Sequence, residues 1–376
     1  MHHKQLLGNE SLRHWLRRFA GALKQPTLAI FAGLVVGGIV IALSGFHPLT
    51  AIGNMLKGGF GSAYYLTTTL TRSTPIIFAG LAAALAWGSG YPSLGASGQM
   101  ILGALICSQA AVRFTGPPLW VITLSLLCGM LGGMLYSLLA AWISDRFKLY
   151  LLIVTLMLNY IADYIASYTT TYLVKDPFGA DASAIQTQRI ESGILPRIFT
   201  GYTVHWGFVI ALVTVIIILF IMKKTTFGYR ARMGGLNPRF AEYGGINSQR
   251  MMYGVLLLSG ALAGLGGACE VLGARFRYVD GMITSPGYAW SGIIASLMAS
   301  NHPVGIFFSS IFLAGLTTGG GAIERSMGVP SEVTTIIQSV ITLLITAHFV
   351  MAARKRHAAP APYTPSEGGD LHESQP

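Results

Sequence analysis

The chain has 376 residues, of which 52% are apolar and only 10% are charged. Because a soluble domain carries about 25% charged residues, this composition excludes an ordinary soluble domain and predicts an all-α polytopic membrane protein. The net charge of +11 does not indicate a nucleic-acid partner, because the basic residues gather at the termini and in one loop, where they indicate orientation in a membrane.

Three regions follow from the distribution of apolar and polar residues. Residues 1–26 are polar and basic and are predicted to form a cytoplasmic tail. Residues 353–376 are rich in Pro, Ser and Glu, and we expect a disordered cytoplasmic tail there. Residues 27–352 are predicted to form the transmembrane domain, with about ten spans and both ends on the cytoplasmic side.

The predicted spans differ in length. Most are continuous apolar runs, and a mixed segment at 46–73 is expected to include an amphipathic piece on the outer surface. The predicted membrane segments are 27–44, the two halves of 74–112, 119–143, 150–173, 204–222, 251–273, 288–300, 304–320 and 332–352.

Two glycine-bearing breaks interrupt the apolar pattern. At 74–112, two apolar halves shorter than a full span flank the sequence YPSLGASGQM, and a similar break precedes the short apolar segment 288–300. The sequence FAGLAAALAWGSG at 78–90 also resembles LSGALAGLGGACEVLG at 258–273. These features predict broken helices and an inverted repeat of about five spans each. An ordinary tight loop between two spans is the alternative for the first break.

A basic loop at residues 223–250 interrupts the apolar sequence and is predicted to be cytoplasmic. Within it, Asn237 is suited to cap a helix and Pro238 to start one. Gly244 and Gly245 are suited to end that helix about two turns later. Because so short a helix is marginal in water, we expect it to bind a partner surface.

Two residues of this short helix are predicted to contact the partner. Phe240 is the candidate apolar anchor, and Ala241 lies on a small-residue face expected to approach the partner closely. Arg239 is placed on another face. A loop that serves only as a basic topology signal is the alternative interpretation.

A polar stripe recurs every fourth residue along 150–173, at Thr155, Asn159, Asp163 and Ser167. Residues with this spacing share one face of a helix. An acidic side chain at membrane depth is costly unless it faces protein or water, so this face is a candidate substrate pathway. Hydrogen bonding between helices is the structural alternative.

Four more residues are assigned to the candidate pathway. Gly98, Gln99 and Trp290 lie at the two breaks, and Glu270 lies near the outer end of its span. Trp290 is also suited to anchor the chain at the membrane interface, and Glu270 is also suited to reach the lipid headgroups.

The sequence lacks the motifs of an enzyme. It contains no phosphate-binding loop of the form G-x-x-x-x-G-K-[ST]. Its three cysteines, Cys107, Cys128 and Cys269, lie singly in apolar segments without metal-ligand spacing. We therefore predict a protein with no catalytic residues, cofactor or metal site.

Several stretches carry a resemblance to a known family. The sequence TTFGYRARMGGLNPRFAEYGGIN in the basic loop resembles the cytoplasmic coupling loop of ABC-importer permeases of the ribose/nucleoside/branched-chain amino acid superfamily. The stretches at 94–104, 258–273 and 292–306 carry the same resemblance, and TLMLNYIADY at 155–164 is most similar to the nucleoside-type members. Ser97 is a departure, because nucleoside-type members typically carry an acid in that stretch.

The resemblance implies a transport subunit in a bacterial cytoplasmic (inner) membrane, in contact with lipid. It implies a second permease, identical or paralogous, a separate ATPase that seats the helix at 237–244, and an extracytoplasmic solute-binding protein. The implied activity is alternating-access import of a nucleoside or simple sugar. An ion-coupled secondary transporter with Asp163 as the relay is the alternative from another class, but it leaves the basic loop unexplained.

Overall fold

The computed structural model describes residues 33, 35–43, 45–176 and 184–328, and a few residues between 332 and 343. Both predicted tails, 1–26 and 353–376, lie outside the described residues, as do part of the first predicted span and most of the last.

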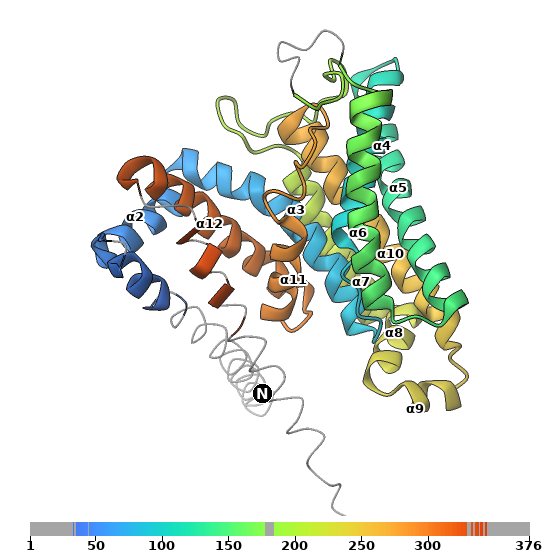
Figure 1. Cartoon of the computed structure of the whole chain (residues 1–376). Helices are drawn as coiled ribbons and strands as arrows, with labels where there is room; N and C mark the ends of the chain where they lie inside the picture. The colour runs from blue at the N-terminus through green and yellow to red at the C-terminus, as the bar shows by residue number, and fades with distance from the viewer. Residues whose placement is uncertain are drawn as a thin grey trace, which may run out of the picture.

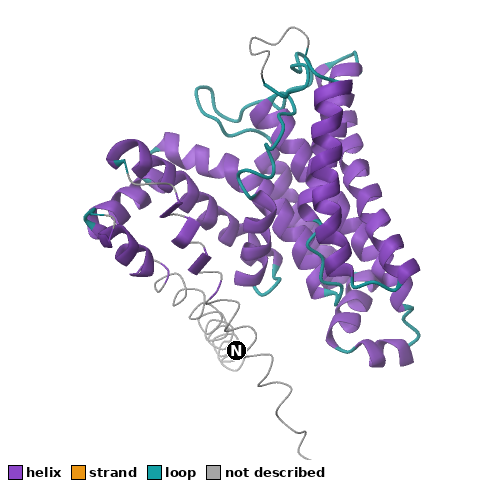
Figure 2. Cartoon of the chain, viewed as in Figure 1, coloured by secondary structure: helices purple, strands orange, loops and turns teal. Residues whose placement is uncertain are grey.

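The described part of the chain is helical, and its only strand-like pairs are isolated bridges between loops. Several helices stand side by side and others slant away beside them, with long loops at one end of the upright group and short helices at its other end (Figures 1 and 2). The elements are α2 Pro48–Phe60, α3 Ala63–Gly88, α4 Ala96–Arg113, α5 Pro118–Phe147, α6 Leu151–Tyr168, η1 Thr169–Leu173, α7 Gly207–Lys224, α8 Thr226–Leu236, α9 Pro238–Tyr243, α10 Ser248–Glu270, η2 Val271–Arg275, α11 Tyr288–Met298 and α12 Pro303–Met327.

Six of the described helices are long and apolar enough to cross a membrane, or seven if a bent pair at Val35–Leu43 and Pro48–Phe60 counts as one span. The structure therefore confirms the all-helical membrane class. It gives fewer full-length spans than the predicted ten, partly because α11 has only 11 residues, which is about 16 Å of helix and too short to cross alone.

The prediction of two shortened helices at 74–112 is wrong in its first half. Residues 74–88 are the end of α3, a helix of 26 residues that starts at Ala63. Its polar first half stays helical because hydroxyl groups are paired with backbone: Thr67 Oγ1 donates to Ala63 O at 2.8 Å and Thr71 Oγ1 to Thr67 O at 2.9 Å. The break at 89–95 is thus a turn between two helices, α3 and α4.

The short apolar segment predicted at 288–300 is present in the structure as the helix α11, Tyr288–Met298. The short helix α11 ends before Ser300 and Asn301, which both have positive φ values of 50° and 62°. The next helix, α12, begins at Pro303 and runs to Met327. The helix is therefore longer than the predicted segment 304–320, because Glu324 and Arg325 lie in its last turn, before the C-cap residue Gly328.

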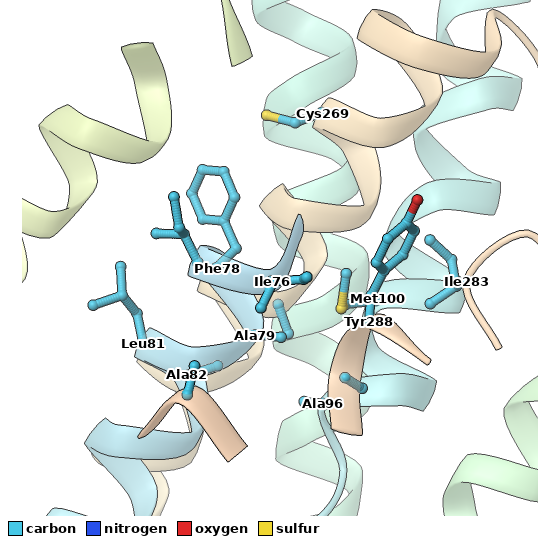
Figure 3. Close-up of a cluster of buried hydrophobic side chains, with 14 of the residues drawn as sticks. Ile76, Phe78, Ala79, Leu81, Ala82, Ala96, Met100, Cys269, Ile283 and Tyr288 are labelled. Carbon is cyan, nitrogen blue, oxygen red and sulfur yellow. The ribbon is translucent and has the colours of Figure 1, made fainter. Parts of the chain in front are cut away.

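The core forms where α3, α4, α10 and α11 meet. Figure 3 shows side chains of these helices, including Phe78, Met100 and Tyr288, gathered in one buried cluster. Helices α3 and α10 are hydrogen-bonded through Ser259 Oγ, which donates to Ala82 O at 2.9 Å. The end of α3 and the start of α10 both lie beside the basic loop, so these two helices run in opposite directions.

Glycine residues allow α4, α5 and α10 to cross at backbone contact. A Cβ on Gly264 would lie 2.4 Å from Gly129 O, and one on Gly133 would lie 2.4 Å from Gly260 O. Real Cβ atoms do not approach that closely, so these positions accept only glycine without a shift of the backbone. Small residues at such crossings are the usual way for membrane helices to pack.

We expect Gly264→Ala to lower the stability of the protein by about 1–3 kcal/mol, because the added methyl group overpacks the crossing. Gly53→Ala is the matched control: Gly53 is also in a helix, and a Cβ there would meet nothing within 4 Å. The control should be neutral or stabilising by up to about 1 kcal/mol. Thermal unfolding in detergent measures both, and equal melting temperatures would contradict the proposed close packing.

Candidate coupling surface and transport pathway

The basic loop, 223–250, folds as two short helices, α8 and α9, before α10 begins. Each of the three helices is capped by the side chain of the residue before it. Thr225 Oγ1 accepts from Gly228 N at 3.2 Å, Asn237 Oδ1 from Phe240 N at 3.1 Å, and Asn247 Oδ1 from Arg250 N at 2.9 Å. Such caps satisfy amide groups that a helix start leaves unpaired.

Sequence analysis correctly placed α9, with Asn237 as its cap and Pro238 at its first position. It missed the 11-residue α8. The signal that could have predicted α8 was Thr225, a residue type that caps helices. Its Oγ1 accepts a hydrogen bond from Gly228 N, three positions later. The glycine pair acts at the other end of α9 as expected, since Gly244 N donates to Phe240 O and Gly245 reverses the chain with a φ of +76°.

The basic loop is held against the turn between α3 and α4. A Cβ on Gly235 would lie 2.5 Å from Gly88 O, so the end of α8 rests directly on the backbone at the end of α3. Tyr91 adds a hydrogen bond from its hydroxyl group to Ser248 O at 2.7 Å. Burial raises the pKa of Tyr91 above its ordinary value, so the hydroxyl group keeps the proton that it donates.

An exposed surface with a mixed character covers the outside of this loop. Its apolar part consists of Leu236, Phe240 and Tyr243, and Phe240 is 63% exposed. Its basic part consists of exposed arginine side chains, among them Arg239. An apolar centre with a charged rim is the usual composition of a protein–protein contact.

The structure revises the role of Ala241. This residue is only 4% exposed, and its carbonyl group accepts from Ile246 N within the same loop. It therefore packs inside the loop, and the face expected to approach a partner through Ala241 is turned inward. A charge at this position would therefore disturb the loop itself.

The first half of the predicted polar stripe on α6 holds the turn between α3 and α4. Thr155 Oγ1 accepts from Leu94 N at 3.1 Å. Asn159 uses both ends of its amide: Nδ2 donates to Leu94 O and Oδ1 accepts from Gly98 N, each at 2.8 Å. For these two side chains the structure shows the hydrogen bonding between helices that was the alternative interpretation.

The second half of the stripe binds a different segment, the loop before α11. Asp163 Oδ1 accepts from Thr284 Oγ1 at 3.1 Å, and Ser167 Oγ donates to Asp280 Oδ2 at 3.0 Å. Both Asp163 and Ser167 remain partly exposed. The stripe therefore differs along its length. Thr155 and Asn159 are hydrogen-bonded to the segment 94–98, whereas Asp163 and Ser167 are partly exposed.

The other candidate pathway residues are not gathered in one place. Gly98 is buried beside Asn159, and the neighbouring Gln99 is buried with an unpaired Oε1 among the described residues. Glu270 is buried beside Tyr288, whose hydroxyl group donates to its Oε1 at 3.2 Å. Trp290 is 52% exposed, which fits the interface anchor weighed as its alternative.

Glu270 also lies near a cation. The distance from Arg275 Nε to Glu270 Oε1 is 3.7 Å, and the second carboxylate oxygen is buried without a partner in the described part of the chain. A buried carboxylate needs such a partner to stay charged. Among the described residues, no group of three or more His, Cys, Asp or Glu side chains is placed to hold a metal ion.

A helical bundle with several spans and one folded loop that presents an apolar and basic surface has the architecture of a membrane transport subunit. A family model described as the permease component of branched-chain amino acid transport systems matches residues 65–346. The chain belongs to this family and is a multi-pass permease subunit of an ABC importer. Membership of this family implies an ATPase and a solute-binding protein as partners.

Curated relatives match along most of the chain. A guanosine ABC transporter permease of Bacillus subtilis is 31% identical over 89% of this chain and 97% of its own length. A glucose ABC transporter permease of Haloferax volcanii is 30% identical over 92% of this chain and 94% of its own length. A nucleoside ABC transporter permease of Lactococcus lactis is 27% identical over 87% and 91%.

We expect Asn159→Leu to reduce the amount of stable protein, because it leaves Leu94 O and Gly98 N without their partner. An unsatisfied buried backbone group costs about 1–3 kcal/mol. Met157→Leu is the control, since Met157 is 50% exposed on the same helix. Yield and melting temperature after purification measure the effect. Normal stability of Asn159→Leu would contradict the structural role given to this amide.

Proposed function

We propose that this chain is the permease of an importer for nucleosides. The supporting observation is the similarity to a guanosine permease, which extends over 97% of that protein's length. A nucleoside permease matches over 91% of its length. The segment 155–164, most similar to nucleoside-type members, forms most of α6, the helix with the polar stripe.

Import of a simple sugar is the second candidate. It is supported by the glucose permease, which is 30% identical over 92% of this chain. The two candidates differ in chemistry, because a nucleoside carries a flat aromatic base and glucose does not. The family assignment decides against the ion-coupled secondary transporter, and the structure gives Asp163 a hydrogen-bonding partner in Thr284.

We infer that the basic loop couples the ATPase to the pathway. The exposed surface around Phe240 would seat on the ATPase, with Asn237, Pro238, Gly244 and Gly245 fixing the shape of α9 and Arg239 at its rim. Movement of the loop would pass through the contact of Gly235 with Gly88 to the turn between α3 and α4. The hydrogen bonds that Leu94 and Gly98 make with α6 would then transmit the movement of the turn to the polar stripe.

The complete importer would contain a second permease beside this one. A second guanosine permease of B. subtilis is 26% identical over 78% of this chain, which supports a paralogous partner as readily as an identical one. We further propose that the chain lies in the cytoplasmic membrane with about ten crossings and both termini in the cytoplasm. The opposite directions of α3 and α10 support an inverted repeat.

Uptake of labelled solute tests the proposed substrate. We expect vesicles that contain the permease with its ATPase and binding protein to accumulate guanosine when ATP is present inside, and not without ATP. Glucose is measured in parallel on the same vesicles. Uptake of glucose but not guanosine would contradict the nucleoside proposal and support the second candidate.

Phe240→Ala tests the proposed ATPase contact. Truncating a buried anchor at an interface costs about 2 kcal/mol or more, so we expect the variant to lose most of its ATPase during purification. Phe199→Ala is the matched control, because Phe199 is 58% exposed but lies in the loops at the opposite end of the bundle. Equal recovery of ATPase with both variants would exclude Phe240 as the anchor.

A further inference from the structure

Helix α6 presents a row of tyrosines on its exposed face. Four tyrosines recur every fourth residue along α6 and η1, and all are exposed: Tyr160, Tyr164, Tyr168 and Tyr172. Residues four apart lie on one face of a helix, at steps of about 6 Å. The exposed side of α6 therefore carries a row of aromatic rings, which we call the tyrosine row, beside a second exposed row that consists of Ile153, Met157, Ile161 and Ile165.

Part of the tyrosine row lies deep in the membrane. Helices α6 and η1 form the candidate span Leu151–Leu173. Tyr160 and Tyr164 lie about 14 and about 20 Å along this span, within a hydrocarbon core about 30 Å thick. Tyrosine is favoured at the two membrane interfaces, where its hydroxyl group meets water, so tyrosines at this depth are not explained by contact with lipid.

The neighbouring helices show what a lipid-facing surface looks like in this protein. On α5 the exposed row consists of Leu127, Leu131, Leu135 and Leu139. On α7 the exposed residues include Val213, Ile216 and Ile217. Both surfaces lack hydroxyl groups at these positions, which suits contact with acyl chains. The tyrosine row has the same helical spacing but a different chemistry.

A carboxylate borders the tyrosine row. Asp163 is partly exposed, about 18 Å along the span, one residue before Tyr164. Its Oδ1 is bound by Thr284 Oγ1 at 3.1 Å, and the next polar residue on that edge, Ser167, binds Asp280. A charged group at this depth must face water or protein. The exposed face of α6 therefore borders a polar environment along this edge.

We propose that the tyrosine row is a stacking surface for the nucleobase along the import pathway, with Asp163 at its polar edge as a hydrogen-bond acceptor. This inference rests on the proposed import of nucleosides. Stacking of one base on an aromatic side chain contributes about 1–3 kcal/mol, which is weak enough for release. Because the same ring recurs about every 6 Å, the base would pass from one tyrosine to the next without a strong binding site that holds it in place.

Cysteine accessibility tests whether the row lies in a solute pathway. The starting protein carries Cys128→Ala, because Cys128 is partly exposed while Cys107 and Cys269 are buried. We expect Tyr164→Cys in the assembled importer to react with a water-soluble methanethiosulfonate, and guanosine to slow that reaction several-fold. Leu135→Cys is the control: residue 135 is 64% exposed on the leucine row of α5 and should stay unreactive.

Two outcomes would overturn the proposal. An unreactive Tyr164→Cys would place the row against lipid or against the second permease. Reaction at the same rate with and without guanosine would make the row a wet surface that the solute does not touch.

Uptake by paired variants tests the stacking chemistry. We expect Tyr160→Leu with Tyr164→Leu to lower guanosine uptake at least tenfold, while Tyr160→Phe with Tyr164→Phe retains most of it because the rings remain. Both variants should assemble with the ATPase as the parent does. If the parent takes up guanosine and the leucine pair matches it, stacking is wrong and the proposed function stands. If the parent takes up no guanosine, both proposals fail.

Discussion

The contact of the basic loop with the turn between α3 and α4 is the constraint on which the rest of the structure depends. Gly235 rests on the carbonyl group of Gly88, and a side chain there would collide with backbone. On its far side the same turn is bound to α6 through Asn159, which pairs with Leu94 in the turn and with Gly98 at the start of α4. One short turn thus joins the surface proposed to bind the ATPase to the helix proposed to line the pathway.

This arrangement explains why a small loop can act on a large bundle. The crossing of α4, α5 and α10 at Gly129 and Gly264 leaves no space for side chains between the backbones, so these helices are expected to shift as rigid bodies. Helix α6 is less enclosed, because only about a quarter of the membrane span that it forms with η1 is buried. A displacement of the turn is therefore expected to move α6 against a firmer core.

The sequence predicted the helical membrane class, the basic loop and the capped helix at Asn237, because hydropathy and capping are local signals. It placed the start of α3 too late, because the segment before residue 74 is rich in polar residues. The hydroxyl groups of Thr67 and Thr71 are hydrogen-bonded to backbone carbonyl groups within the helix, so this polar segment is helical as well. It also placed Ala241 outward, and it did not predict that Asn159 pairs with the backbone of Leu94 and Gly98. Which side of a helix is covered depends on tertiary packing, and spacing alone does not determine it.

The number of solute molecules imported per ATP hydrolysed tests this connection most directly, measured for Tyr91→Phe in vesicles with the complete importer. The variant loses only the hydroxyl group that donates to Ser248 O. The account predicts that ATP hydrolysis continues while guanosine uptake falls, so that the ratio drops several-fold. An unchanged ratio, with normal assembly, would show that movement of the basic loop does not reach the pathway through the turn between α3 and α4.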